Sequence, residues 1–352
     1  MTLCRHFGTC GGCAFQDMAP DAYRAMKREE AVEALKRHGF DTADVAEIVS
    51  VPPRSRRRAS FKAKKKNGAT EIGFHAARSH AIVDMHECLV LTPTLFSAVT
   101  GLRAMLHAIL RENEAAELHV TETDAGLDLA IKWQRKLRPD AAAQFAPWAK
   151  RLGIARITAG NDIVLQLAPP RLCLGPAKVA LPPGAFLQPT REGEGALQSR
   201  LLQLLDGARR VADLFAGCGT FALPLARRAA VHAVDADRPM LAALADAARS
   251  TPGLKPVSTA ARDLFKRPLA PAELNPFDAV LLDPPRAGAK EQAAQIARSK
   301  LRCVAYVSCN AQSFARDARL LADAGFTLGP VTPVDQFLWS AHIELVAGLS
   351  RP

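Results

Sequence analysis

The fold class is decided by one stretch, Arg210-Val211-Ala212-Asp213-Leu214-Phe215-Ala216-Gly217-Cys218-Gly219-Thr220. A short apolar run leads into a loop with two glycines, and a helical pattern follows through Arg228. Glycine lets the backbone turn sharply and approach a ligand closely. In open α/β sheets, ligands bind where such loops leave the carboxyl ends of strands. The stretch therefore predicts a ligand site at the end of a buried strand.

Strands and helices alternate on the C-terminal side of this loop. The apolar runs at 231–234, 277–282 and 303–307 predict strands, and the segments 239–249, 290–299 and 311–324 predict helices. Residues 329–348 predict two more strands. Such alternation with short loops is typical of a mainly parallel sheet that helices cover on both faces.

The N-terminal half has a different rhythm. It predicts a helix at 21–38, strands within 46–90 with an Asn67-Gly68 hairpin turn, a helix at 93–113, and strands with a helix at 118–167. A run of prolines and glycines at 169–184 indicates the approach to a boundary. We therefore divide the chain into a cysteine-rich segment (1–20), a central α+β domain (21–185) and an α/β domain (186–352).

A second acidic residue indicates which cofactor the loop binds. Asp235 ends the next strand, 22 residues after Asp213, where a carboxylate accepts hydrogen bonds from both ribose hydroxyls of a nucleoside. Phe221-Ala222 stands where a dinucleotide loop has its third glycine, so the pyrophosphate grip is missing and S-adenosylmethionine is favoured over NAD. Asp263 follows the next strand and is either an acceptor for the adenine amino group or a helix N-cap.

Three residues are candidates for chemistry. Cys309 lies between a buried strand and a helix, whose N-terminus stabilises a thiolate; the alternative is a buried apolar cysteine. Asp283 precedes two prolines that fix the backbone and project its carboxylate into the cleft. Glu344 lies among apolar residues, which makes it a general base with a raised pKa or, alternatively, a surface residue. In a strand it would share a face with His342.

Four motifs in this order resemble those of the RNA (uracil-5-)-methyltransferase family, most of all its bacterial 23S rRNA branch. They are Asp-Leu-Phe-x-Gly-x-Gly at 213–219, Asp-Pro-Pro-Arg-Ala-Gly at 283–288, Ser-Cys-Asn at 308–310 and His-x-Glu at 342–344, after Phe186-Leu187-Gln188. The resemblance implies a Rossmann-like class I methyltransferase domain and an enzyme that methylates C5 of a uridine in RNA.

The resemblance also implies the roles of individual residues. Cys309 corresponds to the nucleophile that adds to uracil C6, Glu344 to the base that removes the C5 proton, and Asp283 to the acid of the target-base pocket. The positions expected to bind S-adenosylmethionine are Gln188, Phe215, Gly217, Gly219, Thr220, Asp235, Asp263 and Asp283.

Alternative functions remain open from the sequence. One is a tRNA uracil-5 methyltransferase, although that branch of the family generally lacks a cluster of cysteines such as the one described in the next paragraph. The other is a non-catalytic iron–sulfur RNA-binding protein on the same scaffold. Relatives usually carry a small β-barrel RNA-binding domain ahead of the cluster, and we expect it to be absent because Cys4 lies so close to Met1.

The cysteines require a separate explanation. There are eight, with no signal peptide and no long apolar run, so we expect a cytoplasmic protein without a membrane span, in which thiols stay reduced. Cys4, Cys10 and Cys13 form a C-x5-C-x2-C pattern, and Cys88 is a plausible fourth ligand. Four thiolates suit zinc or an iron–sulfur cluster, and three close ligands plus a remote one fit the cluster better. The resemblance implies a 4Fe–4S cluster. We expect the buried-filler role for Cys173, Cys218 and Cys303.

Charge indicates the partner. The 46 basic and 35 acidic residues give a formal net charge of +11, which favours a polyanion. Eight of the basic residues lie within 54–66 on the expected hairpin, which is either a solvated charged hairpin or an RNA-binding surface. We predict RNA contact, by a monomer, through Arg54, Arg56, Arg57, Arg58, Phe61, Lys62, Lys64, Lys65 and Lys66.

Overall fold

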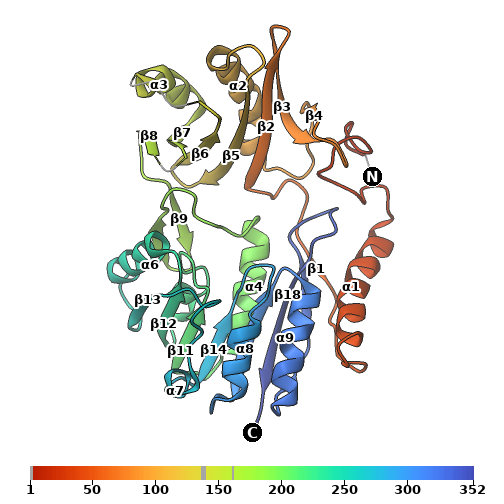
Figure 1. Ribbon diagram of the computed structural model, residues 1–352, viewed down its shortest axis with the longest axis vertical. Coiled ribbons are helices and arrows are strands. Elements are labelled where there is room, and N and C mark those ends of the chain that lie inside the picture. The colour runs from red at the N-terminus through yellow and green to blue at the C-terminus, as the bar shows by residue number, and fades with distance from the viewer. Residues whose placement is uncertain (1–2, 136–139, 161) are drawn as a thin grey trace.

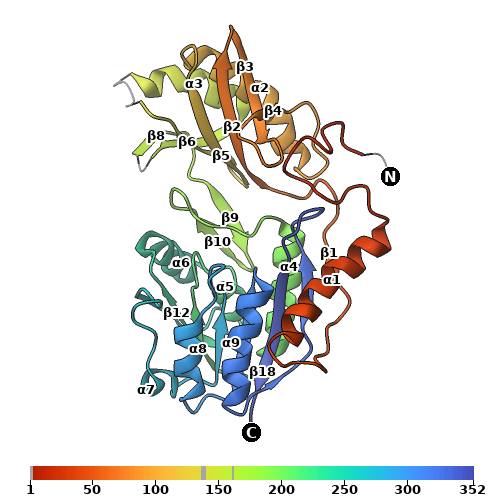
Figure 2. The same ribbon diagram turned by 45° about the vertical axis from the view of Figure 1, so that its right-hand side comes forward.

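The structure is a computed structural model that describes residues 3–135, 140–160 and 162–352. Figure 1 shows two bodies along the long axis, with the C-terminus at the far end of the lower one. Within the described residues, the upper body holds a seven-stranded sheet and the lower body a nine-stranded sheet, with a two-stranded hairpin between them (Figure 2). No helix in these ranges is long and apolar enough to span a membrane.

The lower sheet confirms the predicted mainly parallel α/β architecture. Its strand order is β1-β17-β18-β15-β14-β11-β12-β13, with β16 paired to β18, and β18 is antiparallel to its partners. The strands are β1 (Val49–Ser50), β11 (Arg210–Leu214), β12 (Ala230–Asp235), β13 (Val257–Ala261), β14 (Ala279–Leu282), β15 (Cys303–Ser308), β16 (Thr327–Leu328), β17 (Thr332–Asp335) and β18 (Glu344–Ser350).

Helices cover both faces of this sheet, which explains why its strands are continuous apolar runs. The helices are α1 (Pro20–Lys36), α4 (Arg191–Leu204), α5 (Ala222–Leu225), α6 (Arg238–Ser250), α7 (Pro271–Leu274), α8 (Lys290–Ala297) and α9 (Ala311–Asp323). Side chains of α1, α8 and α9 share one apolar core with Ala212 and Leu214, whereas those of α4, α5 and α6 share another with Val211.

The upper sheet has one covered face and one open face. Its order is β4-β3-β2-β5-β6-β7-β8, and α2 and α3 pack on one side. Its elements are β2 (Arg58–Lys66), β3 (Ala69–His75), β4 (Ile82–Asp84), α2 (Pro93–Ile109), β5 (Ala115–Thr123), β6 (Gly126–Lys132), α3 (Ala141–Leu152), β7 (Ile154–Ala159) and β8 (Asp162–Gln166). Along β2, Ala59, Phe61 and Ala63 are buried against the helices, so Ser60 and Lys62 point to the open face.

The predicted assignment of α1 and β1 to the central domain (21–185) is wrong, because both elements belong to the lower body. Ala31, Ala34 and Leu35 of α1 pack in the core that contains α9, and β1 pairs in parallel with β17. An apolar helix stripe shows that a helix is buried, but not which sheet covers it. The proline- and glycine-rich segment predicted as a boundary forms the hairpin of β9 (Arg171–Leu174) and β10 (Ala177–Ala180), which packs on α6.

A buried ion pair joins the two bodies. The Arg57 guanidinium, 2% exposed, donates from Nη2 to Glu194 Oε2 of α4 at 2.6 Å and from Nε to the carbonyl of Gln188 at 3.0 Å. Arg57 was expected to contact RNA, and that prediction is wrong because its side chain is used inside the protein. Burial raises the pKa of Glu194, and the charge of Arg57 opposes that shift.

Removal of Arg57 should therefore destabilise the fold. In Arg57→Met, Glu194 is left buried without its cation, and we expect a loss of about 3–5 kcal/mol in the free energy of unfolding, measured by urea denaturation. The double variant Arg57→Met/Glu194→Met should regain most of that loss. The exposed Arg54→Met is the matched control, and an equal loss in both single variants would contradict the assignment.

Candidate active site

The register of two strands brings the predicted nucleophile and base together. Ser308, the last residue of β15, pairs with Leu345 of antiparallel β18. Cys309 directly follows β15, and the register therefore brings it close to Glu344, the first residue of β18. Asp283 follows the neighbouring strand β14, which pairs with β15 through Leu282 and Tyr306. The three residues consequently meet at one edge of the sheet, and each carboxylate raises the pKa of Cys309.

Hydrogen bonds hold the turn that carries Cys309. Asn310 accepts the backbone N–H groups of Gln312 and Ser313 as the N-cap of α9. Its amide nitrogen donates to the carbonyl of Arg286 at 3.2 Å, and its backbone N–H donates to the hydroxyl of Ser308. The Ser-Cys-Asn motif is thus a fixed turn that is tied to the loop after Asp283.

The thiol of Cys309 is less acidic than the sequence suggested. The helix N-terminus was expected to favour a thiolate, but burial and the carboxylates of Glu344 and Asp283 raise the pKa of Cys309 to about 11, while Arg286 opposes them. Cys309 therefore carries its proton at neutral pH in the free protein, and a neighbouring base must accept that proton when the sulfur reacts.

Glu344 has the properties expected of a general base. It is 5% exposed, and burial raises its pKa to about 7, against the opposing effects of a hydrogen bond to Gln336 and the charge of Arg58. A carboxylate that titrates near neutral pH accepts protons efficiently there. His342 does not lie in a strand with Glu344 as expected, because β18 begins only at Glu344 and His342 is an exposed residue of the loop before it.

The ends of the central strands carry a row of carboxyl groups. Burial and the charge of Glu344 raise the pKa of Asp283 well above its ordinary value. Asp213, at the end of β11, is fully buried, and burial together with Asp283 and Asp235 raises its pKa to about 8. Apart from the Ala222 backbone, its carboxylate oxygens have no hydrogen-bond partner among the described residues. Such a group favours a cationic ligand beside it.

Asp213 was predicted only as the first residue of the Asp-Leu-Phe-x-Gly-x-Gly motif, without a role of its own. The signal that could have identified it is an acid inside an apolar strand, since aspartate is almost never fully buried without a partner. Gln336 was also missed. It is buried, and its Nε2 donates to Gln188 Oε1 at 2.7 Å, so it connects a predicted cofactor residue with Glu344.

The glycine loop has the backbone geometry that the sequence predicted. Phe215, Gly217 and Gly219 all have positive φ, at 67°, 55° and 90°. A Cβ on Gly219 would lie 2.8 Å from Leu244, so only glycine fits there. Asp235 fixes the loop, because its Oδ2 accepts the N–H of Gly217 at 2.9 Å and its Oδ1 that of Asp237 at 2.8 Å. The carbonyl of Thr220, at the end of the loop, accepts from Gln198.

Asp263 has a local structural role. Its Oδ1 accepts the backbone N–H of Phe265 at 3.0 Å and that of Lys266 at 3.3 Å, so it caps the turn after β13. The ring of the exposed Phe265 lies 5.4 Å from that of the half-buried Phe215, so an aromatic pair lies beside the glycine loop. The second carboxylate oxygen of Asp263 faces Lys266 at 3.8 Å.

A cleft separates the open face of the upper sheet from the lower body. Arg56, Arg58 and Lys132 line one side, and Phe186 and Asp237 line the other. The guanidinium of Arg58 lies 4.4 Å from the centroid of the exposed Phe186 ring. The charge of Arg58 also lowers the pKa of Glu344, so the candidate active site lies near this cleft.

The predicted basic hairpin divides between surface and core. Phe61 is fully buried and stacks on Phe74, so the prediction that it contacts RNA is wrong. Alternation along β2 points Lys62 and Lys64 to the open face, where Lys62 pairs with Glu117. Lys65 donates to the carbonyl of His107, and Lys66 is exposed at the tip with Arg54 exposed at the base.

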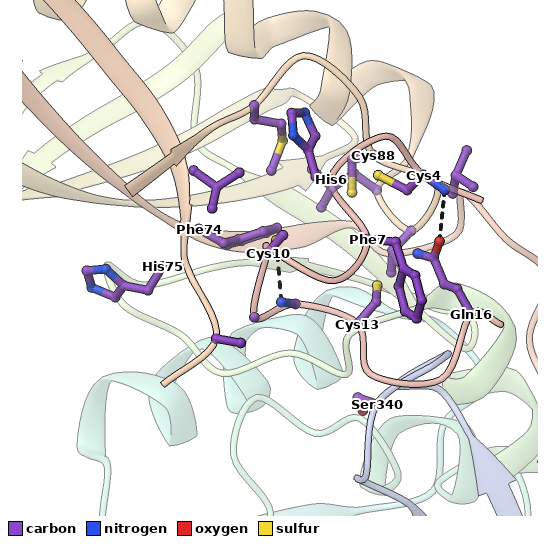
Figure 3. A pocket seen from close by; sticks show the side chains of 18 of the residues that line it. Cys4, His6, Phe7, Cys10, Cys13, Gln16, Phe74, His75, Cys88 and Ser340 are labelled. Atoms are coloured by element: carbon purple, nitrogen blue, oxygen red, sulfur yellow. Dashed lines mark hydrogen bonds between the residues drawn. The ribbon is translucent and has the colours of Figure 1, made fainter. Parts of the chain in front are cut away.

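The four N-terminal cysteines line one cavity. Figure 3 shows Cys4, Cys10, Cys13 and Cys88 around it, and His342 and Ser340 line the same cavity. Burial raises the pKa of each thiol, that of Cys13 to about 12. Within the described ranges, no group of His, Cys, Asp and Glu is arranged to hold a single metal ion. Of the other cysteines, Cys218 is buried as expected, Cys303 is partly buried and Cys173 is exposed, so the filler role of Cys173 is wrong.

Glu344 makes stability depend on pH with a defined sign. Its pKa of about 7 exceeds the ordinary 4.5, so the folded protein binds more protons than the unfolded chain between these values. Stability is therefore lost as the pH rises through this window. We expect Glu344→Gln to unfold at the same urea concentration as wild type near pH 4 but to be more stable by up to about 3 kcal/mol near pH 8.5.

The control for this measurement is Glu29→Gln on the exposed side of α1. A stability difference between Glu344→Gln and wild type that stays constant with pH would refute the buried, ionisable assignment.

Comparisons with known proteins identify the family. Residues 258–351 match the family described as tRNA (Uracil-5-)-methyltransferase. A Brucella suis protein described as an uncharacterized RNA methyltransferase is 44% identical over 348 residues, covering 99% of this chain and 84% of the relative. The Halomonas elongata 23S rRNA (uracil(1939)-C(5))-methyltransferase RlmD is 31% identical over 99% of this chain and 76% of its own length.

The fold is also shared with a solved structure. The Pyrococcus abyssi tRNA (uracil-54, C5)-methyltransferase in complex with S-adenosyl-L-homocysteine has a TM-score of 0.75 and 21% identity, over 99% of this chain and 88% of that one. Sequence identity to relatives of similar length, together with the matched motifs, shows that the chain belongs to the RNA (uracil-5-)-methyltransferase family.

Proposed function

We propose that this protein transfers a methyl group from S-adenosylmethionine to C5 of a uridine in 23S rRNA. The observation that carries the proposal is the pairing of Ser308 with Leu345, which brings the next residues, Cys309 and Glu344, close together at the edge of the sheet where the glycine loop lies. A nucleophile and a base that lie close together suit a reaction that needs one on each side of the same ring.

The chemistry follows from the residue types. The sulfur of Cys309 bonds to C6, and the electrons of the C5–C6 double bond make C5 nucleophilic. C5 takes the methyl group from the sulfonium, which leaves as S-adenosylhomocysteine. Glu344 then accepts the C5 proton, the C–H electrons restore the double bond, and the thiolate leaves. We assign the initial proton of Cys309 to Asp283, the other carboxylate beside the thiol, so that Glu344 stays free to accept the C5 proton.

The carboxyl row supports the choice of cofactor. S-adenosylmethionine carries a sulfonium and an ammonium. The buried Asp213 and the half-buried Asp283 form no ion pair among the described residues. A cationic ligand would lower the pKa of both carboxyls and so gain binding energy from their ionisation. Asp235, whose carboxylate already orders the loop, is assigned to the ribose hydroxyls, and Gln188, Phe215, Thr220 and Asp263 to the remainder of the cofactor.

The cleft with Arg56, Arg58 and Lys132 is assigned to RNA, since Lys and Arg neutralise phosphates. The 23S rRNA target is supported by the Halomonas relative, whose name states that substrate. A tRNA target is the second candidate, favoured by the family description that residues 258–351 match. Both candidates place the enzyme in the cytoplasm with the RNA.

The cysteine cavity is assigned to a 4Fe–4S cluster with Cys4, Cys10, Cys13 and Cys88 as ligands. Four thiols line one cavity, and three ligands close in sequence with a remote fourth fit an iron–sulfur cluster better than zinc. The N–H of Gly12 donates to the sulfur of Cys10, as expected for a site that stabilises thiolates. When bound, such a cluster would fasten the N-terminal segment to the upper body.

The first test separates the two chemical roles. Cys309→Ala should abolish 5-methyluridine formation, measured by mass spectrometry of total RNA, while S-adenosylmethionine still binds by calorimetry. Glu344→Gln should accumulate a covalent protein–RNA adduct, because the thiolate cannot leave until the C5 proton is removed. Mapping methylated uridines in a strain that lacks the gene distinguishes 23S rRNA from tRNA. Normal turnover by Cys309→Ala would refute the mechanism.

The second test concerns the cysteine cavity. Anaerobically purified protein should show the visible charge-transfer absorption of an iron–sulfur cluster, with iron and acid-labile sulfide in equal amounts. Cys88→Ser should lose both, whereas Cys173→Ser, which changes an exposed cysteine outside the cavity, should retain them. Stoichiometric zinc in a colourless protein would overturn the cluster assignment.

A further inference from the structure

The loop between β17 and β18 ends at Glu344, and a cluster of buried polar side chains forms hydrogen bonds with the backbone of this loop. Lys27 of α1, fully buried, donates to Asp335 Oδ1 at 2.6 Å and also to the carbonyl of His342. Tyr23, one turn earlier in α1, donates to the other carboxylate oxygen of Asp335 at 2.7 Å. The hydroxyl of Tyr23 in turn accepts the backbone N–H of Trp339 at 2.7 Å.

Trp339 lies in the middle of this loop and has a strained backbone. Its φ is 60°, a conformation that a bulky side chain adopts only when its surroundings hold it there. Tyr23 holds its N–H, and its carbonyl accepts the N–H groups of Ala14 at 2.7 Å and Phe15 at 3.2 Å. The peptide groups on both sides of one residue are thus fixed from two directions.

The Lys27–Asp335 pair and Tyr23 matter for the loop as well as for the stability of the fold. A buried Lys–Asp pair gives little net stability, because the desolvation of both charges offsets their attraction. In this protein, however, the pair and the tyrosine touch the loop at two points, Trp339 and the carbonyl of His342, and the second lies two residues before the base. Glu344 pairs with Val334 of β17, and neither this pairing nor that with β15 extends to residues 336–343 before it.

We infer that Tyr23 and Lys27 are positioning residues of the methylation reaction: through Asp335, Trp339 and the carbonyl of His342 they set the carboxylate of Glu344 where it reaches the C5 proton. The inference rests on the proposed function. It assigns α1, predicted from the sequence as part of an RNA-binding domain, to the last step of catalysis. Neither residue contacts Cys309 or the glycine loop, so the two earlier steps do not depend on them.

The test separates these steps with a modified substrate. In an RNA that contains 5-fluorouridine at the target, the thiolate adds to C6 and the methyl group transfers to C5, as before. The final step cannot follow, because fluorine would have to leave without the electrons of its bond. The covalent adduct therefore accumulates, and its rate of formation reports addition and methyl transfer without any action of Glu344 on C5.

Tyr23→Phe should affect the two assays differently. We expect turnover on the uridine RNA to fall about tenfold or more, while the rate of adduct formation with the 5-fluorouridine RNA stays within about twofold of wild type. On the uridine RNA, the same variant should accumulate adduct that wild type does not. The buried double variant Lys27→Met/Asp335→Leu, which leaves no unpaired charge, should show the same division.

The chain provides a matched control. Its second tyrosine, Tyr306, is also buried and donates to a buried aspartate, Asp317, at 2.7 Å, but it does not touch the loop 336–343. Tyr306→Phe removes the same atom from the same kind of pair, and its loss of stability by urea denaturation gauges the structural effect. We expect Tyr306→Phe to lower turnover and adduct formation by the same factor, whatever its size.

Two outcomes would overturn the inference. One is an equal fall of turnover and adduct formation in Tyr23→Phe, which would show a general structural role. The other is unchanged turnover in both Tyr23→Phe and the double variant. A wild-type protein that forms neither 5-methyluridine nor the adduct would refute the proposed function itself. This result can be told apart from the other two because it is seen in the protein without any substitution.

Discussion

The antiparallel pairing of β18 with β15 is the constraint on which the candidate active site depends. In an all-parallel sheet, only the carboxyl ends of strands reach the ligand edge. Because β18 runs the other way, its amino end reaches that edge, and its first residue, Glu344, meets Cys309 at the end of β15. The glycine loop of β11 opens at the same edge. The predicted nucleophile and the predicted base, more than thirty residues apart in the chain, thereby become neighbours.

Exclusion of water gives these residues their chemistry. Burial raises the pKa of Cys309, Glu344, Asp283 and Asp213, and the carboxylates reinforce one another. A site of this kind is unfavourable while it lacks a positive ligand, since several acids compete to remain protonated. The same burial makes the site favour a cationic ligand. It also leaves the pKa of Glu344 close to neutral pH, where its carboxylate can accept a proton. The functional site is therefore also a place where the fold gives up stability.

Predictions from the sequence were right where a short stretch of backbone decides the structure. They failed where packing between segments distant in the chain decides it. The Asp-Leu-Phe-x-Gly-x-Gly stretch predicted its strand and loop, because positive φ and close packing at Gly219 are demands of the local backbone. The basic run predicted a charged hairpin, but not its faces. Arg57 and Phe61 lie between residues of the open face and are buried, since side chains alternate along a strand. Assignment of α1 to the central domain failed because its apolar stripe fits either sheet.

The sequence by itself determined the mainly parallel α/β sheet and its glycine loop, because each depends on short-range spacing and residue type. It proposed Cys309, Glu344 and Asp283 as catalytic residues through their resemblance to the motifs of a family. Only the tertiary structure decided which groups face one another: Cys309 with Glu344, Arg57 with Glu194, and α1 with the loop before the base. These relations arise from strand register and from the packing of segments distant in the chain. The pKa values of the buried acids follow from the same packing, since burial has no signature in the spacing of residues.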